Sequence, residues 1–272
     1  MKKEGFVLIF VLLVIVTLAS LIAFLRLKAF QEAKFSQQIK AEREMALSLP
    51  GLAAYCRQEA MQIESEVQEG ATTEEEILEQ SEDFLVIDCS LPEMEITARF
   101  SSESIRFNLN QPEEEALQEL LEEEGFTPEQ AQIMTQSLLD WLDKDNEHHF
   151  LGAEKDYYEP LGYAPRNGPL ATLDEVVLVR GFDPYLFWIK PGLYDLFTIY
   201  TQGNTQKLAR SEVERGAAEG LLSLKTPGVF REEIEVSYLG RKWRYLEVFS
   251  TVNGEPQVLY YHLLPSLGQE EK

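Results

Sequence analysis

The first thirty residues constrain the fold of this chain more than any other segment. Residues 6–25 contain no charged side chain; Lys2 and Lys3 precede the run, and Arg26 and Lys28 follow it. A helix of about 20 residues at about 1.5 Å rise per residue reaches about 30 Å, enough to cross the hydrocarbon core of a bilayer. The sequence therefore predicts a transmembrane helix over 6–25. The two N-terminal lysines favour a cytoplasmic N-terminus, with the rest of the chain on the other side.

Three interpretations of this segment compete. A cleaved secretory signal has a shorter apolar core of about 7–15 residues, and residues 19–23 form a poor cleavage site. A plain membrane anchor and a prepilin-type leader are the other two. In a prepilin, a short basic peptide ending at Gly5 is cut on the cytoplasmic side, which leaves Phe6 as the new N-terminus. Both alternatives predict an apolar helix in the membrane.

The fifth residue after Gly5 is relevant to the prepilin interpretation. Most pilin-like proteins carry a glutamate there, which offsets the N-terminal amine of a neighbouring subunit. This chain has Phe10. A subunit at the end of a filament has no neighbour above it whose amine needs a carboxylate, and a buried charge without a partner would cost several kcal/mol. The alternative is that Phe10 is simply a lipid-facing side chain.

The charge balance narrows the classes of partner. The chain has 272 residues, with 24 Lys and Arg against 47 Asp and Glu, which gives a net charge of −23. Such a surface repels phosphate backbones, so we expect no nucleic-acid partner. It suits divalent cations or basic protein surfaces. The length predicts one or two domains beyond the membrane segment.

The two cysteines leave two alternatives open. Cys56 lies in a helical pattern and Cys89 ends a strand-like run. In an oxidising compartment they could form a disulfide. They could equally be buried free thiols, because pairing cannot be derived from sequence.

Hydrophobic patterns predict the elements of the first half of the chain. A long helix runs from Phe6 to about Ser48, a break follows at Pro50-Gly51, and a second helix covers about 52–69. An acidic stretch over 64–83 reads as a solvated connection. Strands follow over 84–87, 94–100 and 105–109, the last two forming a hairpin around the turn 101–104.

A helical unit comes next. Asn110 can cap a first helix that runs to Gly125, and Thr127 with Gln130 forms a capping-box start for a second helix. The second helix is expected to bury Ala131, Met134, Leu138, Trp141 and Leu142. A further short helix is expected from Lys207 to about Leu224.

The C-terminal part predicts strands again, over 233–239, 242–252 and 257–264. Leu239-Gly240-Arg241 and Asn253-Gly254 are the turns between them, and Asn-Gly is a strong hairpin signal. We expect six side chains of these strands to pack on the long helix: Trp243, Tyr245, Val248, Val258, Tyr260 and Leu263.

The stretch 140–158 is the richest in metal-ligating side chains. Asp143, Asp145 and Glu147 are spaced by two, and Glu154 follows Asp143 at the spacing that closes an EF-hand calcium loop. His148 stands where an EF-hand needs glycine, and no clear helix follows Glu154. The spacing therefore predicts a loop-type calcium site, with a solvated acidic loop as the alternative. The histidines 148 and 149 lack metal-site spacing and are expected to be exposed, and no catalytic motif is recognisable.

Several motifs resemble the minor pseudopilin K family of type II secretion systems. They are the run from Leu138 to Asp143, then Gly152-Ala153-Glu154 and Tyr157-Tyr158, Asn167 to Leu170, and the segments 173–176 and 178–181. Phe107-Asn108-Leu109-Asn110 and the leader with an apolar fifth residue are also similar. The resemblance covers about 1–199.

This resemblance implies an α+β fold in which a pilin-like long N-terminal helix packs on an antiparallel β-sheet, with a large α-helical domain inserted in the sheet. The corresponding segments are a leader over 1–5, a transmembrane helix over 6–25, the pilin-like helix and first strands over 26–109, the inserted domain over 110–225 and the C-terminal strands over 226–272.

The resemblance also implies a function. Family members are non-enzymatic tip subunits of a periplasmic pseudopilus; they assemble with minor pseudopilins I and J, and prepilin peptidase cuts and N-methylates their leader. They bind calcium in the inserted region, which makes Asp143, Asp145 and Glu154 the first ligand candidates here, with Glu147 and Asp156 after them. The implied location is the inner membrane of a bacterium, as a single-pass protein.

The chain departs from the family after Thr201, where only Gly203-Asn204-Thr205 remains of a longer family element. We therefore expect the insert to be truncated or its second half to be rebuilt, which would alter its interface more than its fold. Two other functions stay open. A type IV pilus or uptake-system minor pilin that touches DNA would need a basic patch. A membrane-anchored hydrolase would lose activity on changes at Asp140 or His148.

Overall fold

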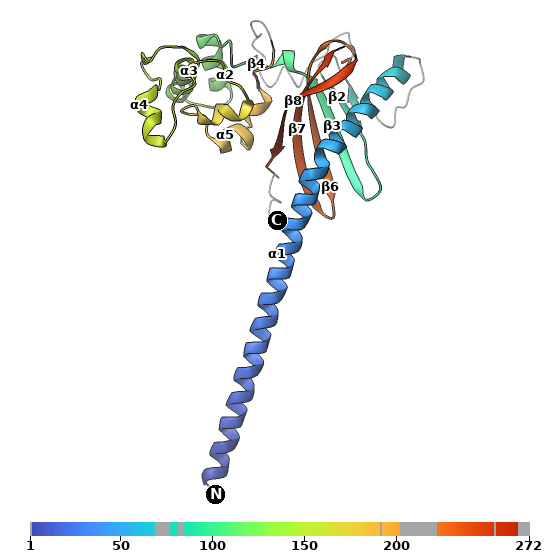
Figure 1. Cartoon of the computed structure of the whole chain (residues 1–272), viewed down its shortest axis with the longest axis vertical. Coiled ribbons are helices and arrows are strands. Elements are labelled where there is room, and N and C mark those ends of the chain that lie inside the picture. Colours follow the sequence, from blue (N-terminus) through green and yellow to red (C-terminus); the bar gives the residue numbers. More distant parts are fainter. Residues whose placement is uncertain are drawn as a thin grey trace. The chain divides into compact units, whose positions relative to one another are not determined.

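The computed structural model describes residues 2–68, 77–80, 84–190, 192–201, 222–252 and 254–265. The chain divides into two units, Met1–Leu52 and Ala53–Lys272. The second unit holds an antiparallel sheet and a helical region inserted between two of its strands, so the fold is α+β (Figure 1). Residues 207–221 of the helix predicted over 207–224, and all of Gly203-Asn204-Thr205, lie outside the described residues, and the described residues 222–224 are not helical.

One continuous helix, α1, covers Lys2–Gln68 (Figure 1). The break predicted at Pro50-Gly51 is wrong. Proline removes one backbone hydrogen bond and crowds the preceding turn, which often ends a helix. Here the turns after Pro50 bury Ala53, Cys56, Ala60 and Ile63 at helical spacing. This packing outweighs the local cost of the proline.

The first part of α1 carries a long exposed apolar surface. Phe10, Leu12, Leu13 and Ile15 are each more than half exposed, and apolar side chains continue to be exposed as far as Ile39. The helix is long and apolar enough to cross a membrane. Gly5 and Phe6 lie inside α1, and their processing stays a prediction.

Among the described residues, the main sheet has six antiparallel strands in the order β1-β2-β3-β6-β7-β8 (Figure 1). Their bounds are β1 Ile77–Gln80, β2 Phe84–Asp88, β3 Met94–Ser102, β6 Gly228–Tyr238, β7 Arg241–Val252 and β8 Glu255–Leu264. Strand β1 was not predicted, because it lies in the acidic stretch taken for a solvated connection. The β6–β7 hairpin turns at Leu239-Gly240 as predicted. Strands β7 and β8 also pair as a hairpin, and Asn253 of their turn lies outside the described residues.

The hairpin predicted between 94–100 and 105–109 does not form. Strand β3 continues to Ser102, whose hydroxyl accepts a hydrogen bond from the Ser104 N–H at the start of a 3-10 turn, η1 (Glu103–Ile105). The next strand, β4 (Phe107–Asn108), leaves the main sheet and pairs in parallel with β5 (Phe197–Thr198). This second, two-stranded sheet joins the two ends of the inserted region.

The sheet buries different side chains on its two faces. On the face toward α1, Tyr245 and Phe249 are buried, and the Arg57 guanidinium lies 4.4 Å from the centre of the Phe249 ring. On the opposite face, Val248 and Tyr260 belong to the core of the inserted region. The prediction that all six residues of the last strands pack on the long helix is therefore wrong for these two. It is also wrong for Val258 and Leu263, which are 46% exposed, whereas Trp243 is buried.

A disulfide joins α1 to the sheet. Cys56 on α1 and Cys89, just after β2, are bonded with a Cα–Cα distance of 5.6 Å. The sequence left open a disulfide or two buried free thiols, and the structure contains the disulfide. Because Cys89 follows the strand that pairs with β3, the bond fixes the second half of α1 to one side of the sheet.

A buried charge cluster lies where α1 meets β6 and β7. Arg57 donates hydrogen bonds to Glu232, at 3.0 Å, and to Glu247. Burial, opposed by Arg57 and reinforced by Glu247, raises the pKa of Glu232 from 4.5 to about 8. Two carboxylates share one guanidinium here, so a proton on Glu232 balances the cluster.

We expect this protonation to make stability pH-dependent. The folded protein holds a proton on Glu232 that the unfolded chain releases, so the free energy of unfolding should fall as pH rises from 4.5 to about 8 and then level off. The slope contributed by one proton is at most about 1.4 kcal/mol per pH unit. Urea unfolding of the wild type and of Glu232→Gln at pH 6, 7 and 8 measures it. Equal slopes for both proteins would contradict the assignment.

The inserted region is helical. Its helices are α2 Glu114–Glu123, α3 Pro128–Leu142, α4 Lys155–Tyr158 and α5 Pro184–Trp188, with short 3-10 turns η2 (Glu159–Leu161), η3 (Leu173–Leu178) and η4 (Leu193–Asp195) between or after them. The capping box at Thr127 and Gln130 is confirmed. The predicted cap at Asn110 is wrong, because its amide instead exchanges hydrogen bonds with the backbone of Leu170, and Glu113 precedes the helix. Of the five side chains expected to be buried on α3, all but Leu142 are.

Candidate metal centre

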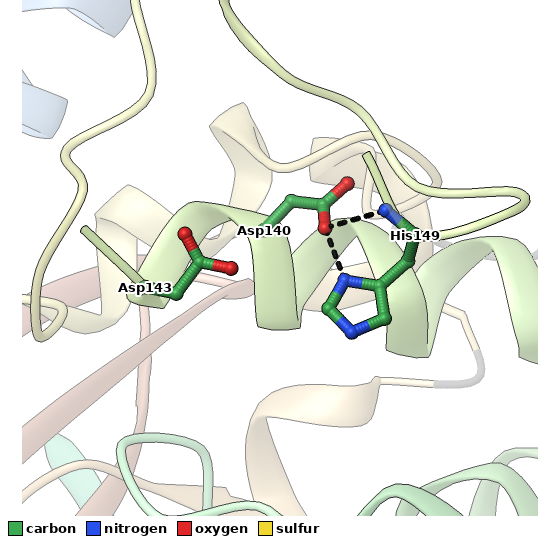
Figure 2. A group of neighbouring side chains, drawn as sticks. All are labelled: Asp140, Asp143 and His149. Atoms are coloured by element: carbon green, nitrogen blue, oxygen red, sulfur yellow. Dashed lines mark hydrogen bonds and ion pairs between the residues drawn. The ribbon is translucent and has the colours of Figure 1, made fainter. Parts of the chain in front are cut away.

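The centre begins in the last turn of α3 with Asp140, which is fully buried. Its Oδ1 accepts a hydrogen bond from the backbone N–H of His149, at 3.1 Å, and contacts the ring nitrogen Nδ1 of the same residue (Figure 2). Its Oδ2 has no hydrogen-bond partner among the described residues. Gly152 passes close by: a Cβ atom at this position would lie 1.9 Å from that Oδ2. Only glycine lets the loop approach the carboxylate this closely.

The chain after α3 folds as two consecutive Asx turns. Asp143, the residue that ends α3, accepts the N–H of Asp145 at 3.2 Å, and Asp145 accepts the N–H of Glu147 at 2.8 Å. The side-chain amide of Asn167 donates to the backbone carbonyl of Asp145 at 2.7 Å. Asp and Asn favour such turns because a short side chain replaces a backbone acceptor. The turns hold the two carboxylates at one end of the loop.

Glu154 closes the loop from the other side. It directly precedes α4, so a one-turn helix does follow it, contrary to the prediction. The side chain is buried, and within the described part of the chain neither carboxylate oxygen has a hydrogen-bond partner. An ionised carboxylate without partners in such a place is costly.

The structure brings together some of the predicted ligands and adds others. Asp143, Asp145 and Glu154 form one group, in which the ligand atoms lie within 4.8 Å of one another. Asp140, Asp143 and His149 form a second group within the same limit (Figure 2). The predicted ligands Glu147 and Asp156 are in neither group. Asp156 instead forms an ion pair with His148 at 2.9 Å and is largely exposed.

Sequence reasoning missed Asp140 and His149 as site residues. One signal was available for Asp140, which precedes Asp143 by three positions on a helix and so shares its face. The role of His149 depends on how the loop folds back on α3, and the sequence spacing does not show this. His149 is partly exposed, as expected for a loop histidine, but its ring faces Asp140 (Figure 2).

A shell of neutral and cationic groups holds the loop in place. Arg180 donates to the backbone carbonyls of Leu151, at 3.3 Å, and Gly152, at 3.0 Å, and its guanidinium lies 4.9 Å from the centre of the Tyr157 ring. The amide oxygen of Gln136, on α3, accepts the N–H of Leu151 at 2.9 Å. These contacts press the Leu151-Gly152 backbone against Asp140.

Burial and neighbouring negative charges in the centre disfavour the ionised form of its carboxylates. Burial and then the neighbouring Asp145 raise the pKa of Asp143, and burial followed by Asp140 and Asp143 raises the pKa of Glu154. The hydrogen bond to Asp140 raises the pKa of His149. All three shifts describe a site with an excess of negative charge.

The donor set fits a hard divalent cation. Ca²⁺ takes six to eight oxygen ligands, often carboxylates in a flexible loop. Asp140 and Glu154 have carboxylate oxygens with no hydrogen-bond partner among the described residues. These oxygens also fit a cation site, since a bound cation would coordinate them. Asp140, Asp143, Asp145 and Glu154 are therefore the residues that would hold the ion. His149 would orient Asp140, because nitrogen is a poor ligand for Ca²⁺.

His262 lies on β8, bonded to Asp174 at 3.0 Å and stacked on Trp188 with ring centres 3.9 Å apart. The hydrolase hypothesis rests on Asp140 and His148. The structure pairs Asp140 with His149, and His148 with Asp156.

Comparison with known proteins agrees with the motifs around this centre. The family model of type II secretion system (T2SS) protein K matches residues 101–188, which run from the end of β3 to the end of α5. The type II secretion system protein K of Dickeya chrysanthemi is 38% identical over 63 residues, which are 23% of this chain and 17% of that protein. The segment 101–188 is therefore similar to the type II secretion system protein K family.

The matched protein K domain contains every residue of the candidate metal centre. The chain is also similar to one in the crystal structure of the GspK-GspI-GspJ complex from the enterotoxigenic Escherichia coli type 2 secretion system. That match has a TM-score of 0.46 and 14% identity, and covers 66% of this chain and 84% of the other. The chain aligns with only about a sixth of the length of the Dickeya protein K.

Proposed function

We propose that this protein is a non-enzymatic minor pseudopilin at the tip of the type II secretion pseudopilus. It would assemble with minor pseudopilins I and J and take part in protein export across the outer membrane. The observation that carries the proposal is the protein K domain, inserted between β3 and β6 of a sheet that packs on a long N-terminal helix. A helix to join a bundle and a bulky domain on one end suit a subunit that ends a filament.

The location follows from the same elements. The apolar part of α1 would lie in the inner membrane, with the N-terminus in the cytoplasm and the sheet and inserted domain in the periplasm. The disulfide between Cys56 and Cys89 supports an oxidising compartment for the second unit. The negative charge supports a protein or cation partner over a nucleic acid.

Calcium is the proposed ligand of the metal centre. One ion would neutralise part of the carboxylate group formed by Asp140, Asp143, Asp145 and Glu154, and so order the loop between α3 and α4. In this proposal the ion is structural, and it fixes the surface of the inserted domain.

Processing of the N-terminus tests the prepilin part of the proposal. We expect the protein isolated from membranes of its native host to begin at N-methylated Phe6, because prepilin peptidase would cut after Gly5. Intact-mass and N-terminal peptide mass spectrometry measure this directly. The variant Gly5→Leu should retain the leader. The control variant Gly51→Leu, in a part of α1 that is not cleaved, should be processed as the wild type is. A wild-type protein that keeps residues 1–5 would contradict the assignment.

Assembly tests the function itself. The full-length chain, expressed with minor pseudopilins I and J, should co-purify with them from detergent-solubilised membranes. Deletion of its gene should stop export of the host's type II cargo, and the wild-type gene should restore it. Export that continues without the gene would reject the proposed function.

A further inference from the structure

A cleft of about 580 Å³ opens on the inserted domain, between the C-terminal end of α3, the segment 163–166 and η3. The larger side chains that line it are Trp141, Tyr163, Arg166, Asp174, Glu175 and Leu178. These residues are distinct from the ligand candidates of the metal centre. We call this hollow the η3 cleft.

Hydrogen bonds between its walls hold the η3 cleft in shape. The carboxylate of Glu175 accepts the indole N–H of Trp141 at 3.1 Å and the backbone N–H of Ala171 at 2.9 Å. The hydroxyl of Tyr163 donates to the backbone carbonyl of Leu178 at 3.0 Å. A site that is formed before its ligand arrives spends little conformational entropy on binding.

The charge of the η3 cleft is negative. Arg166 forms an ion pair with Glu175 at 3.3 Å, so these two charges balance. The side chain of Asp174 is 51% exposed, and one of its oxygens lies 3.0 Å from Nδ1 of His262. Burial lowers the pKa of His262, so the imidazole is neutral at pH 7 and does not cancel the charge of Asp174.

The same cleft has apolar walls. Leu178 is 41% exposed, and the half-buried ring of Tyr163 lies 6.3 Å from that of Trp141. Lysine and arginine lay an aliphatic stem along apolar surface and keep a cationic head outside it, and aromatic ring faces attract such cations. An acidic ligand is disfavoured, because the whole chain carries a net charge of −23.

We propose that the η3 cleft binds a segment of a partner protein in which a lysine or arginine stands between aliphatic residues. The stem of the basic side chain would lie against Tyr163 and Leu178, and its head would pair with Asp174. Neighbouring aliphatic side chains would fill the rest of the cleft. The inserted domain would thereby have a peptide-binding site in addition to its metal centre.

NMR of the indole groups tests this site directly. The chain has three tryptophans, of which Trp141 lines the cleft, Trp188 lies on α5 and Trp243 lies on β7. The probe is the peptide acetyl-Ala-Leu-Lys-Leu-Ala-amide, titrated into the full-length ¹⁵N-labelled protein in detergent. The signal of Trp141 should shift and saturate, while the other two stay in place. The same peptide with glutamate instead of lysine should bind at least about tenfold more weakly.

Three variants test the residues of the η3 cleft. Asp174→Asn should weaken binding of the lysine peptide about fivefold. Ala164→Phe, at an exposed position that lines the cleft, should fill it and abolish binding. Glu129→Gln removes an exposed carboxylate at the start of α3 and should bind as the wild type does. Melting temperatures near that of the wild type would show that the variants are folded.

The proposal has clear contradicting results. It is overturned if the wild type shows no shift of the Trp141 signal, or if the glutamate peptide binds as tightly as the lysine peptide. Unchanged binding by Asp174→Asn and Ala164→Phe would overturn it too. Each of these results leaves the proposed function intact, because assembly into a pseudopilus does not depend on this cleft.

Discussion

Saturating calcium is expected to raise the melting temperature of this protein by about 5–10 °C. A ligand at about 100 times its dissociation constant stabilises the folded state by about 2.7 kcal/mol, and each kcal/mol shifts the midpoint of a domain of this size by about 2–4 °C. The physical reason is the group of carboxylates at the end of α3 and in the following loop, where Asp140 and Glu154 have buried oxygens with no hydrogen-bond partner among the residues that the structure describes. Calorimetric titration and thermal melts with calcium or chelator measure the effect.

Three variants test which residues of this region bind or position calcium. Asp143→Asn removes the carboxylate shared by both groups and should abolish the shift. Gly152→Ala should weaken binding by about 10- to 100-fold, because the new methyl group must displace Asp140. Asp156→Asn is the matched control: it is an exposed carboxylate of the same region, outside both groups, and should bind as the wild type does. A shift that survives Asp143→Asn, or no shift in the wild type, would reject the site.

The part of this centre that could be predicted from the sequence is the part that depends on local spacing. Asp143, Asp145 and Glu154 were predicted from their positions in one loop, and the structure brings them together. Asp140 was missed because its environment is made by Gly152, twelve positions later, whose missing side chain leaves room for a buried carboxylate. Such a contact appears only when the loop is closed.

The same distinction applies to the fold. The capping box at Thr127 was predicted correctly because both of its hydrogen bonds lie within one turn. The hairpin expected after β3 was predicted wrongly. Arg106 donates hydrogen bonds to Asp195, near the C-terminal end of the inserted region, and these bonds help to draw β4 out of the main sheet. Long-range packing likewise overrode the helix break at Pro50. Local signals were reliable where no distant side chain competed with them.

These long-range contacts also explain how a large insertion can be held firmly by the sheet. Tyr194 and Asp195, near the end of the insertion, are bonded to Arg244 and Arg106, next to or within the sheet. On β8, His262 stacks on Trp188 of α5. Several charged and aromatic contacts thus cross the boundary between the inserted domain and the sheet.

Arg231 is the centre of this boundary, and its replacement by methionine is expected to destabilise the second unit by about 3–5 kcal/mol. Arg231 is fully buried on β6. It donates to Glu103 of η1 and to the carbonyls of Tyr194 and Phe197, the last at 2.9 Å. Removing the guanidinium leaves a buried carboxylate and two carbonyls without this donor. Urea unfolding followed by circular dichroism measures the change.

Two further variants accompany Arg231→Met. One is a control, and the other tests whether the buried ion pair causes the loss of stability. Arg166→Met removes an exposed arginine whose ion pair with Glu175 is 3.3 Å long, and should cost less than about 1 kcal/mol. Arg231→Met combined with Glu103→Leu should recover most of the lost stability, because replacing both members of a buried pair by apolar groups removes the uncompensated charge. If the double variant is no more stable than Arg231→Met alone, the cost arises from the bonds to Tyr194 and Phe197. In that case the joint between sheet and insertion depends on the two carbonyls, and the ion pair contributes little to it.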